Sequence, residues 1–184
     1  MKTIGIDLSG KEENPTGIAI LRERYIESDI LYSTEHIVER CQSEKPDIVG
    51  IDAPLSAPEG GGFRSSDRML IERGYRVLPP TFGGMKILTE RGIRLAGNLR
   101  ELGYKVIEVH PLTSGLILFN TKSRNEWVSN LLDESWDLDL GSTDHEIDSA
   151  IAAITGLLYL MDRTEEVGEE DDLIIIPSGN LQAL

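Results

Sequence analysis

The sequence predicts a single α/β domain over residues 1–184, built on a mixed sheet whose first three strands are antiparallel and whose later strands are parallel. Three observations predict this class. Residues 1–31 contain three short β-branched segments with no helix between them, and helices then follow one another with strands in between. The length of 184 residues also suits one domain with helices on both faces of its sheet.

The N-terminal part reads as a three-strand meander, then a helix and a fourth strand. Each expected strand is a short apolar run, and the first stops at the turn residues Ser9 and Gly10. The helix begins at Ser33, a favourable N-cap, and ends before Pro46. We expect strands at residues 3–7, 16–21, 25–31 and 47–51, with the helix at 33–45.

Proline and glycine organise the rest of the chain. Residues 54–63 (PLSAPEGGGF) cannot sustain a regular element and are expected to form a long loop. Beyond it we expect helices at 65–74, 84–102, 124–132 and 143–161, and strands at 105–109 and 173–176. An acidic run before the last strand is expected to be a solvated turn: Glu165, Glu166, Glu169, Glu170, Asp171 and Asp172. This element order is that of the ribonuclease-H-like fold, whereas a flavodoxin-like chain would alternate strand and helix from the start.

The composition excludes several classes of protein. No apolar span of about 18 residues is present, so no membrane helix is expected. A strand is expected to begin within the first three residues, so no signal peptide is expected either. The single cysteine, Cys41, excludes an internal disulfide and a zinc site of several thiolates, which suits a cytoplasmic protein. The formal net charge of −14 means that a polyanionic substrate must be met by local arginines and lysines or by bridging cations.

Two apolar strands each end in an aspartate, Asp7 and Asp52. Either residue alone could simply cap a turn. If the first and fourth strands are neighbours in the sheet, however, the two carboxylates lie side by side, and like charges at that separation require a divalent ion or a shared proton. Mg²⁺ and Mn²⁺ prefer such hard oxygen ligands, so the pair indicates a metal site.

The late helix supplies further acidic and basic groups. Its apolar stripe leaves Asp144, His145 and Asp148 on an adjacent face at helical spacing. Helix capping accounts for Asp144 but less well for Asp148, which is therefore the third candidate ligand. Two more candidates lie near residue 109: Glu108 stands inside an apolar strand and could alternatively face solvent at a sheet edge, while His110 could be a base or a turn residue.

Five motifs together carry a resemblance that covers nearly the whole chain: GIDLSG with Thr16-Gly17, PDIVGIDAPLS, RSSDRMLIERGYRVL, VIEVHP and HEIDSAIAAITG. The chain resembles a family of predicted ribonuclease-H-like nucleases that was long catalogued as a domain of unknown function. More distantly, Asp7, Asp52 and the spacing from His145 to Asp148 resemble the metal-binding positions of Holliday-junction resolvases. One departure is that Asp52 stands where those enzymes have a glutamate, which shortens its reach by one methylene.

The resemblance implies a nuclease that cleaves phosphodiester bonds with two Mg²⁺ or Mn²⁺ ions. Asp7 would bridge both ions, with Asp52 on one and Asp148 on the other, and His145 or Glu108 would orient water or move a proton. The substrate phosphate of a nucleic acid or nucleotide-like molecule would meet basic residues that could equally be ordinary surface charges: Lys11, Arg64, Arg68 and Arg76.

Two other functions stay open at this point. A hydrolase or a binding protein for a small phosphorylated or nucleotide-like metabolite would suit the acidic charge. An actin-like phosphotransferase is a weaker alternative, because that class needs two copies of the fold to enclose a nucleotide. Membranes are not expected partners, and a homodimer is an open expectation.

Overall fold

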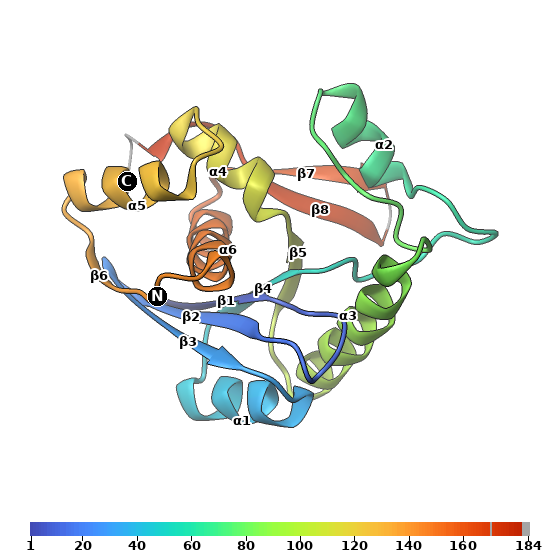
Figure 1. The fold of residues 1–184 in the computed structure, drawn as a ribbon, viewed down its shortest axis with the longest axis horizontal. Helices are drawn as coiled ribbons and strands as arrows, with labels where there is room; N and C mark the ends of the chain where they lie inside the picture. Colours follow the sequence, from blue (N-terminus) through green and yellow to red (C-terminus); the bar gives the residue numbers. More distant parts are fainter. Residues whose placement is uncertain (170, 182–184) are drawn as a thin grey trace.

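A computed structural model describes residues 1–169 and 171–181 of the chain. Its strands are β1 (Lys2–Asp7), β2 (Thr16–Arg22), β3 (Tyr25–Leu31), β4 (Ile48–Asp52), β5 (Val106–Val109), β6 (Asp137–Asp139), β7 (Thr164–Glu169) and β8 (Asp172–Pro177). Its helices are α1 (Thr34–Glu44), α2 (Ser65–Glu72), α3 (Gly84–Glu101), α4 (Pro111–Phe119), α5 (Arg124–Asp133) and α6 (Asp144–Leu160). The described strands form one sheet in the order β6-β3-β2-β1-β4-β5-β8-β7 (Figure 1).

The strand pairing confirms the predicted fold class. β1 pairs antiparallel with β2, and β2 pairs antiparallel with β3, as the meander requires. On its other side β1 pairs parallel with β4, which is followed by the parallel strands β5 and β8. The first strand is therefore central, and the strand ends that carry Asp7 and Asp52 are neighbours.

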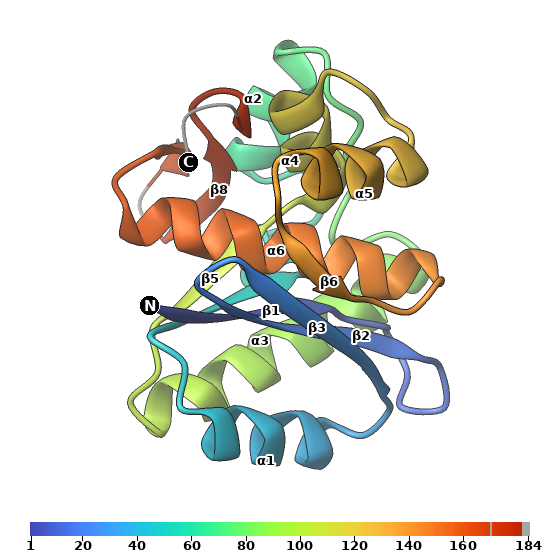
Figure 2. The ribbon, with the colours of Figure 1, turned by 90° about the vertical axis from the view of Figure 1, so that its left-hand side faces the viewer.

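Helices cover both faces of the sheet, as predicted. On one face α1 and α3 enclose an apolar core that includes Ile6, Ile51 and Leu95. On the other face α6 lies across the central strands, with α4 and α5 packed outside it (Figure 2). Trp127 of α5 is fully buried in this second core, together with Ile151 of α6.

Glycines in the sheet let α6 lie directly on the central strands. A side-chain carbon on Gly5 of β1 would overlap the main chain of Ser149, and one on Gly17 of β2 would overlap the main chain of His145. Gly50 of β4 also faces the helix backbone, so main chain rests on main chain here. This close approach holds the start of α6 over the ends of the central strands.

Two of the predicted helix starts, those of α1 and α6, are confirmed by their caps. The Ser33 hydroxyl accepts a hydrogen bond from His36 N at the start of α1. At the start of α6, Thr143 and Glu146 form a capping box, in which each side chain accepts from the backbone of the other. The box fixes the start of α6, whose first two turns carry His145 and Asp148.

Three elements of the structure were not predicted: α4, β6 and β7. α4 (PLTSGLILF) follows Pro111 and is apolar on most sides, so it lacks the alternation that marks a surface helix. β6 has only three residues at the edge of the sheet.

The prediction that the acidic run forms a solvated turn was wrong. Its first part belongs to β7, which pairs antiparallel with β8, and β8 itself begins at Asp172. In β7, Val167 is buried against Leu70 of α2 and Ile174 of β8, while Glu165 and Glu166 are exposed. A strand with a single buried residue shows too little alternation to be predicted. Glu170, which was included in that run, lies outside the described residues.

No helix in the described part of the chain is long and apolar enough to cross a membrane. Cys41 lies on the buried face of α1, and burial raises the pKa of its thiol to about 12. Cys41 is therefore a core residue rather than a nucleophile.

Candidate functional site

Two strand ends bring Asp7 and Asp52 together. Asp7 is the last residue of β1 and pairs in register with Asp52, the last residue of β4. Residues that pair in register point to the same face of a sheet, and for this pair it is the face that α6 covers, since Gly5 and Gly50 lie two residues earlier beneath that helix.

The first turns of α6 add a histidine and a third aspartate. His145 Nδ1 lies 2.6 Å from Asp7 Oδ2 in a hydrogen bond, in which the imidazole N–H donates when the carboxylate is ionised. Asp148 lies three residues later, on nearly the same side of the helix, and its charge raises the pKa of Asp7. Asp7, Asp52 and Asp148 therefore form what we call the acidic cluster.

The acidic cluster is electrostatically strained. Burial raises the pKa of Asp7 to about 6, against the lowering effect of the hydrogen bond from His145. The pKa of Asp52 is raised well above its ordinary value, first by burial and then by the charges of Asp7 and Asp148. The pKa of Asp148 is also raised, again mainly by burial. A cation bound between these carboxylates would stabilise their ionised forms.

A cation that sequence reasoning missed contacts the cluster. Arg124, the first residue of α5, grips Asp148 with a bidentate fork, Nε to Oδ1 at 2.7 Å and Nη2 to Oδ2 at 2.5 Å. Its Nη1 lies 3.4 Å from Asp144 Oδ2, and its guanidinium stands 5.7 Å from the centre of the Trp127 ring. Arg124 lies 24 residues before Asp148, and nothing in the local sequence links the two.

The donor chemistry of the cluster suits a divalent ion. Carboxylate oxygens are the preferred ligands of Mg²⁺ and Mn²⁺, and the pKa values of Asp7 and Asp52 are raised first by burial and then by neighbouring carboxylates, which a bound cation would offset. In the side-chain arrangement of the described residues, however, no three His, Cys, Asp or Glu side chains are placed to hold a metal. Both oxygens of Asp148 are taken by Arg124, and one oxygen of Asp7 by His145.

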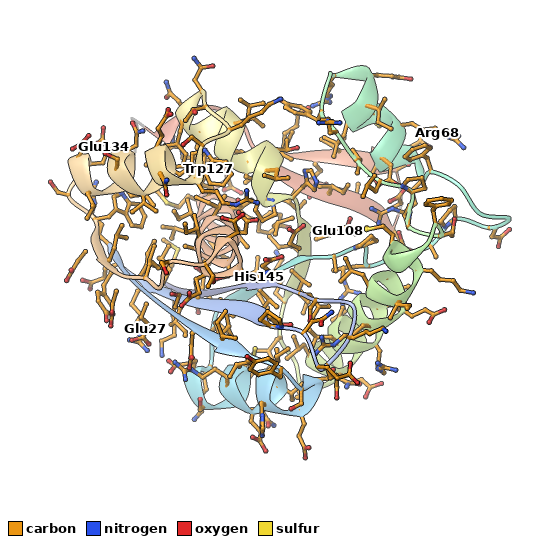
Figure 3. The ribbon with its side chains drawn as sticks, viewed as in Figure 1. Glu27, Arg68, Glu108, Trp127, Glu134 and His145 are labelled. Atoms are coloured by element: carbon orange, nitrogen blue, oxygen red, sulfur yellow. The ribbon has the colours of Figure 1, made fainter. Side chains whose placement is uncertain are left out.

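Glu108 does not join the acidic cluster. It pairs in register with Ile51, whose side chain packs in the core under α1 and α3, so Glu108 points to the opposite face from Asp52. In Figure 3, His145 lies at the centre of the view and Glu108 to its right. Glu108 accepts hydrogen bonds from both Nη atoms of Arg64, at 2.8 and 2.6 Å, and from Leu55 N at 2.7 Å.

Arg64 is buried in an ion-pair network rather than presented to a substrate. Its side chain is only 3% exposed, and beyond Glu108 it donates to Asp67 through Nε and Nη2. Asp172 lies 3.5 Å away and accepts from Ser66. Arg64 therefore ties β5, the loop after β4, α2 and β8 together.

The other three predicted phosphate contacts are exposed. Lys11 lies in the turn between β1 and β2, Arg68 on α2, and Arg76 after α2. Arg68, labelled in Figure 3 beside α2, lines a hollow of about 370 Å³ together with Ser65 and the acidic Asp171. The structure does not bring these cations into contact with the acidic cluster.

His110 caps the start of α4 with its Nδ1 hydrogen-bonded to Thr113 Oγ1 at 2.7 Å. Burial lowers the pKa of His110 to about 4, so the imidazole is neutral near pH 7. His110 is thus a buried, neutral residue at the start of a helix.

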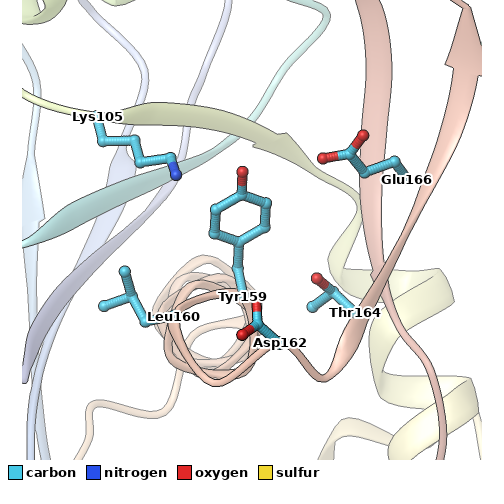
Figure 4. A pocket seen from close by; sticks show the side chains of 6 residues that line it. All are labelled: Lys105, Tyr159, Leu160, Asp162, Thr164 and Glu166. Carbon is cyan, nitrogen blue, oxygen red and sulfur yellow. The ribbon is translucent and has the colours of Figure 1, made fainter.

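A hollow of about 420 Å³ lies at the other end of α6, between Lys105, Tyr159 and Glu166 (Figure 4). The Lys105 ammonium stands 4.4 Å from the centre of the Tyr159 ring. Because α6 rises about 1.5 Å per residue, this hollow is about 20 Å along the helix from His145. It does not belong to the acidic cluster.

Solved structures with a similar fold define the class of this protein. RuvC from Thermus thermophilus in complex with a Holliday junction substrate superposes with a TM-score of 0.53 at 13% sequence identity, covering 87% of this chain and 94% of that one. A second Thermus thermophilus RuvC structure gives a TM-score of 0.52 at 12% identity, covering 88% and 97%. Together with the sheet topology, these similarities establish a ribonuclease-H-like fold.

Within that class, the chain belongs to the family described as "Protein of unknown function (DUF429)", which matches residues 5–172. The matched range includes Asp7, Asp52, Arg124 and Asp148. The search of curated proteins found no match.

Proposed function

We propose that this protein is a divalent-cation-dependent hydrolase of phosphodiester bonds, that is, a nuclease. The observation that carries the proposal is the acidic cluster: two strand ends and one helix bring Asp7, Asp52 and Asp148 to one face of the sheet. Burial raises the pKa of each, and repulsion from the other carboxylates of the cluster adds to this for Asp7 and Asp52. Three largely buried carboxylates on one face favour the binding of a cation beyond the one that Arg124 supplies.

The cluster would hold two Mg²⁺ or Mn²⁺ ions, with Asp7 shared between them, Asp52 on one and Asp148 on the other. When bound, such ions lower the pKa of water and stabilise charge on the phosphoryl group. His145 orients the Asp7 carboxylate through their hydrogen bond, and with 42% of its side chain exposed it can exchange a proton with solvent.

Glu108 acts as a positioning residue in this proposal. It accepts a hydrogen bond from Leu55 N, three residues after Asp52, and it is itself held by the buried Arg64. Through these contacts Glu108 fixes the path of the chain as it leaves β4, and so the direction in which Asp52 points.

The substrate class is a nucleic acid strand or junction, approached through exposed cations that include Lys11, Arg68 and Arg76. The RuvC structure with a Holliday junction makes branched DNA a substrate to test. The second candidate is a small phosphorylated or nucleotide-like metabolite, which the net charge of −14 favours because a long polyanion would be repelled. One cysteine and its buried thiol suit a cytoplasmic setting.

The first experiment is calorimetry with Mn²⁺ on the wild type and on Asp7→Asn, Asp148→Asn and Asp133→Asn. Asp133 is exposed at the end of α5, so its variant controls for the loss of one negative charge. We expect Mn²⁺ binding to be lost in the first two variants and kept in the control. Equal binding by all four proteins would remove the proposal.

The second experiment separates the substrates. Labelled single strands, duplexes and four-way junctions are incubated with the wild type and Asp7→Asn in Mg²⁺, beside a panel of small phosphodiesters. Cleavage of polymers by the wild type alone supports the nuclease, and hydrolysis restricted to the small compounds supports the second candidate.

A further inference from the structure

Arg124 and Arg64 both bind buried carboxylates, but their surroundings differ. The Arg64 side chain is 3% exposed, and its partners Glu108 and Asp67 are buried as well. The Arg124 side chain is 24% exposed, and its two acidic partners on α6 differ in depth: Asp148 is 8% exposed and Asp144 is 73% exposed. Arg64 is enclosed, whereas Arg124 is partly exposed and pairs with both a buried and an exposed aspartate.

The fork of Arg124 takes both carboxylate oxygens of Asp148. Its charge also lowers the pKa values of Asp7 and Asp52, so it offsets the repulsion within the whole cluster. These are the effects that a divalent ion would have at the same place. A metal that uses Asp148 must therefore compete with a cation that belongs to the chain.

We propose that Arg124 is an internal competitor for the metal: it occupies the cation position on Asp148 in the metal-free protein and moves outward to Asp144 when an ion binds. This inference rests on the proposed function, since it requires an ion at the acidic cluster. Asp144 precedes Asp148 by one helical turn, and its Oδ2 already lies 3.4 Å from Arg124 Nη1. A small outward movement of the guanidinium keeps that partner while it frees Asp148.

The arrangement explains two features. It explains why no three ligating side chains converge among the described residues although three aspartates share one face, because the guanidinium holds Asp148. It also gives a role in metal binding to Asp144, an exposed residue whose charge favours the start of the helix. Arg124 itself is anchored by α5, where the neighbouring Trp127 is fully buried.

The test is Mn²⁺ calorimetry on the full chain, with Arg124→Ala, Arg124→Lys and the control Lys122→Ala. Charge-assisted hydrogen bonds of this kind change an equilibrium constant by about tenfold or more, so Arg124→Ala should bind Mn²⁺ about tenfold tighter or more. Arg124→Lys keeps the charge but cannot form the fork and should fall between the two. Lys122 is exposed in the loop before α5, so its variant removes the same charge without the contact and should match the wild type.

The outcomes are distinguishable. If the wild type and Arg124→Ala bind Mn²⁺ equally, or the variant binds more weakly, the competition is overturned and the proposed function stands. If neither binds Mn²⁺, the proposed function itself fails, and this inference fails with it. If Lys122→Ala gains as much as Arg124→Ala, general charge rather than the fork sets the affinity, and the proposal is also overturned.

The first of two further measurements uses the wild type alone and keeps the proposal testable if Arg124→Ala folds poorly; the second tests the part played by Asp144. In the wild type, the Nε–H resonance of Arg124 should shift and exchange faster on titration with Mg²⁺, and an unchanged resonance at saturation would contradict displacement. Asp144→Asn should weaken Mn²⁺ binding in the wild type but not in the Arg124→Ala background. Equal weakening in both backgrounds would show that Asp144 does not act through Arg124.

Discussion

Asp7→Asn should make the metal-free protein more stable near neutral pH. In the folded chain the pKa of Asp7 rises from 3.8 to about 6, mainly because the carboxyl is buried. For an acid with a raised pKa, the folded state is favoured by the bound proton: stability is fully present below about pH 3.8 and is lost as pH rises to about 6. At about 1.4 kcal/mol per pKa unit, the loss of unfolding free energy reaches about 3 kcal/mol. The uncharged amide of the Asp7→Asn variant does not incur this loss.

The assay is urea unfolding in EDTA at pH 4.5 and pH 7.5, for the wild type, Asp7→Asn and the exposed control Asp133→Asn. We expect Asp7→Asn to gain up to about 3 kcal/mol at pH 7.5 and much less at pH 4.5, with little change in the control. Saturating Mg²⁺ should narrow the gap by stabilising the wild type. A variant less stable than the wild type at pH 7.5, or a gain independent of pH, would refute the assignment of Asp7 as a strained carboxyl.

Three more predictions concern the elements that hold the site. Gly5→Ala should lower the free energy of unfolding by about 1–3 kcal/mol or more, because the added carbon overlaps the main chain of α6. The control Gly97→Ala on α3, where nothing lies within 4 Å, should be neutral or stabilising. Equal losses of unfolding free energy for the two variants in urea unfolding would contradict this. Glu108→Gln should cost about 3 kcal/mol in the same assay, since it leaves the buried Arg64 without its principal counter-charge; a neutral result would mean that Arg64 finds another partner. Cys41 should react with a thiol reagent only as fast as the protein unfolds, because its thiol is buried with a pKa of about 12, and rapid labelling of the native protein would disprove that environment.

The fold could be predicted largely because its strands are short apolar runs with clear ends. Asp7 and Asp52 end such runs, and the structure places them side by side at the ends of two neighbouring central strands. The elements that were missed have weak local signals: β7 buries only Val167 among its six residues, and α4 has no polar face. Their structure depends on partners distant in sequence.

The contacts of the candidate site were harder to predict than its position. Whether Glu108 points toward Asp52 depends on strand register, which a sequence pattern does not fix, and the structure pairs Glu108 with Ile51 instead. Arg64 was expected at a substrate phosphate but is enclosed by Glu108 and Asp67. Arg124 gave no signal at all, because its contact with Asp148 exists only after α5 has packed against α6.

The backbone-to-backbone contact of α6 with the strands at Gly5 and Gly17 affects how the sequence of this protein can diverge. No side chain separates the helix from the sheet there, so the spacing between the groups on α6 and those at the strand ends is set by backbone alone. Substitutions that repack the surrounding apolar interior can accumulate without altering that spacing. Sequences could therefore diverge widely while the acidic groups keep their places.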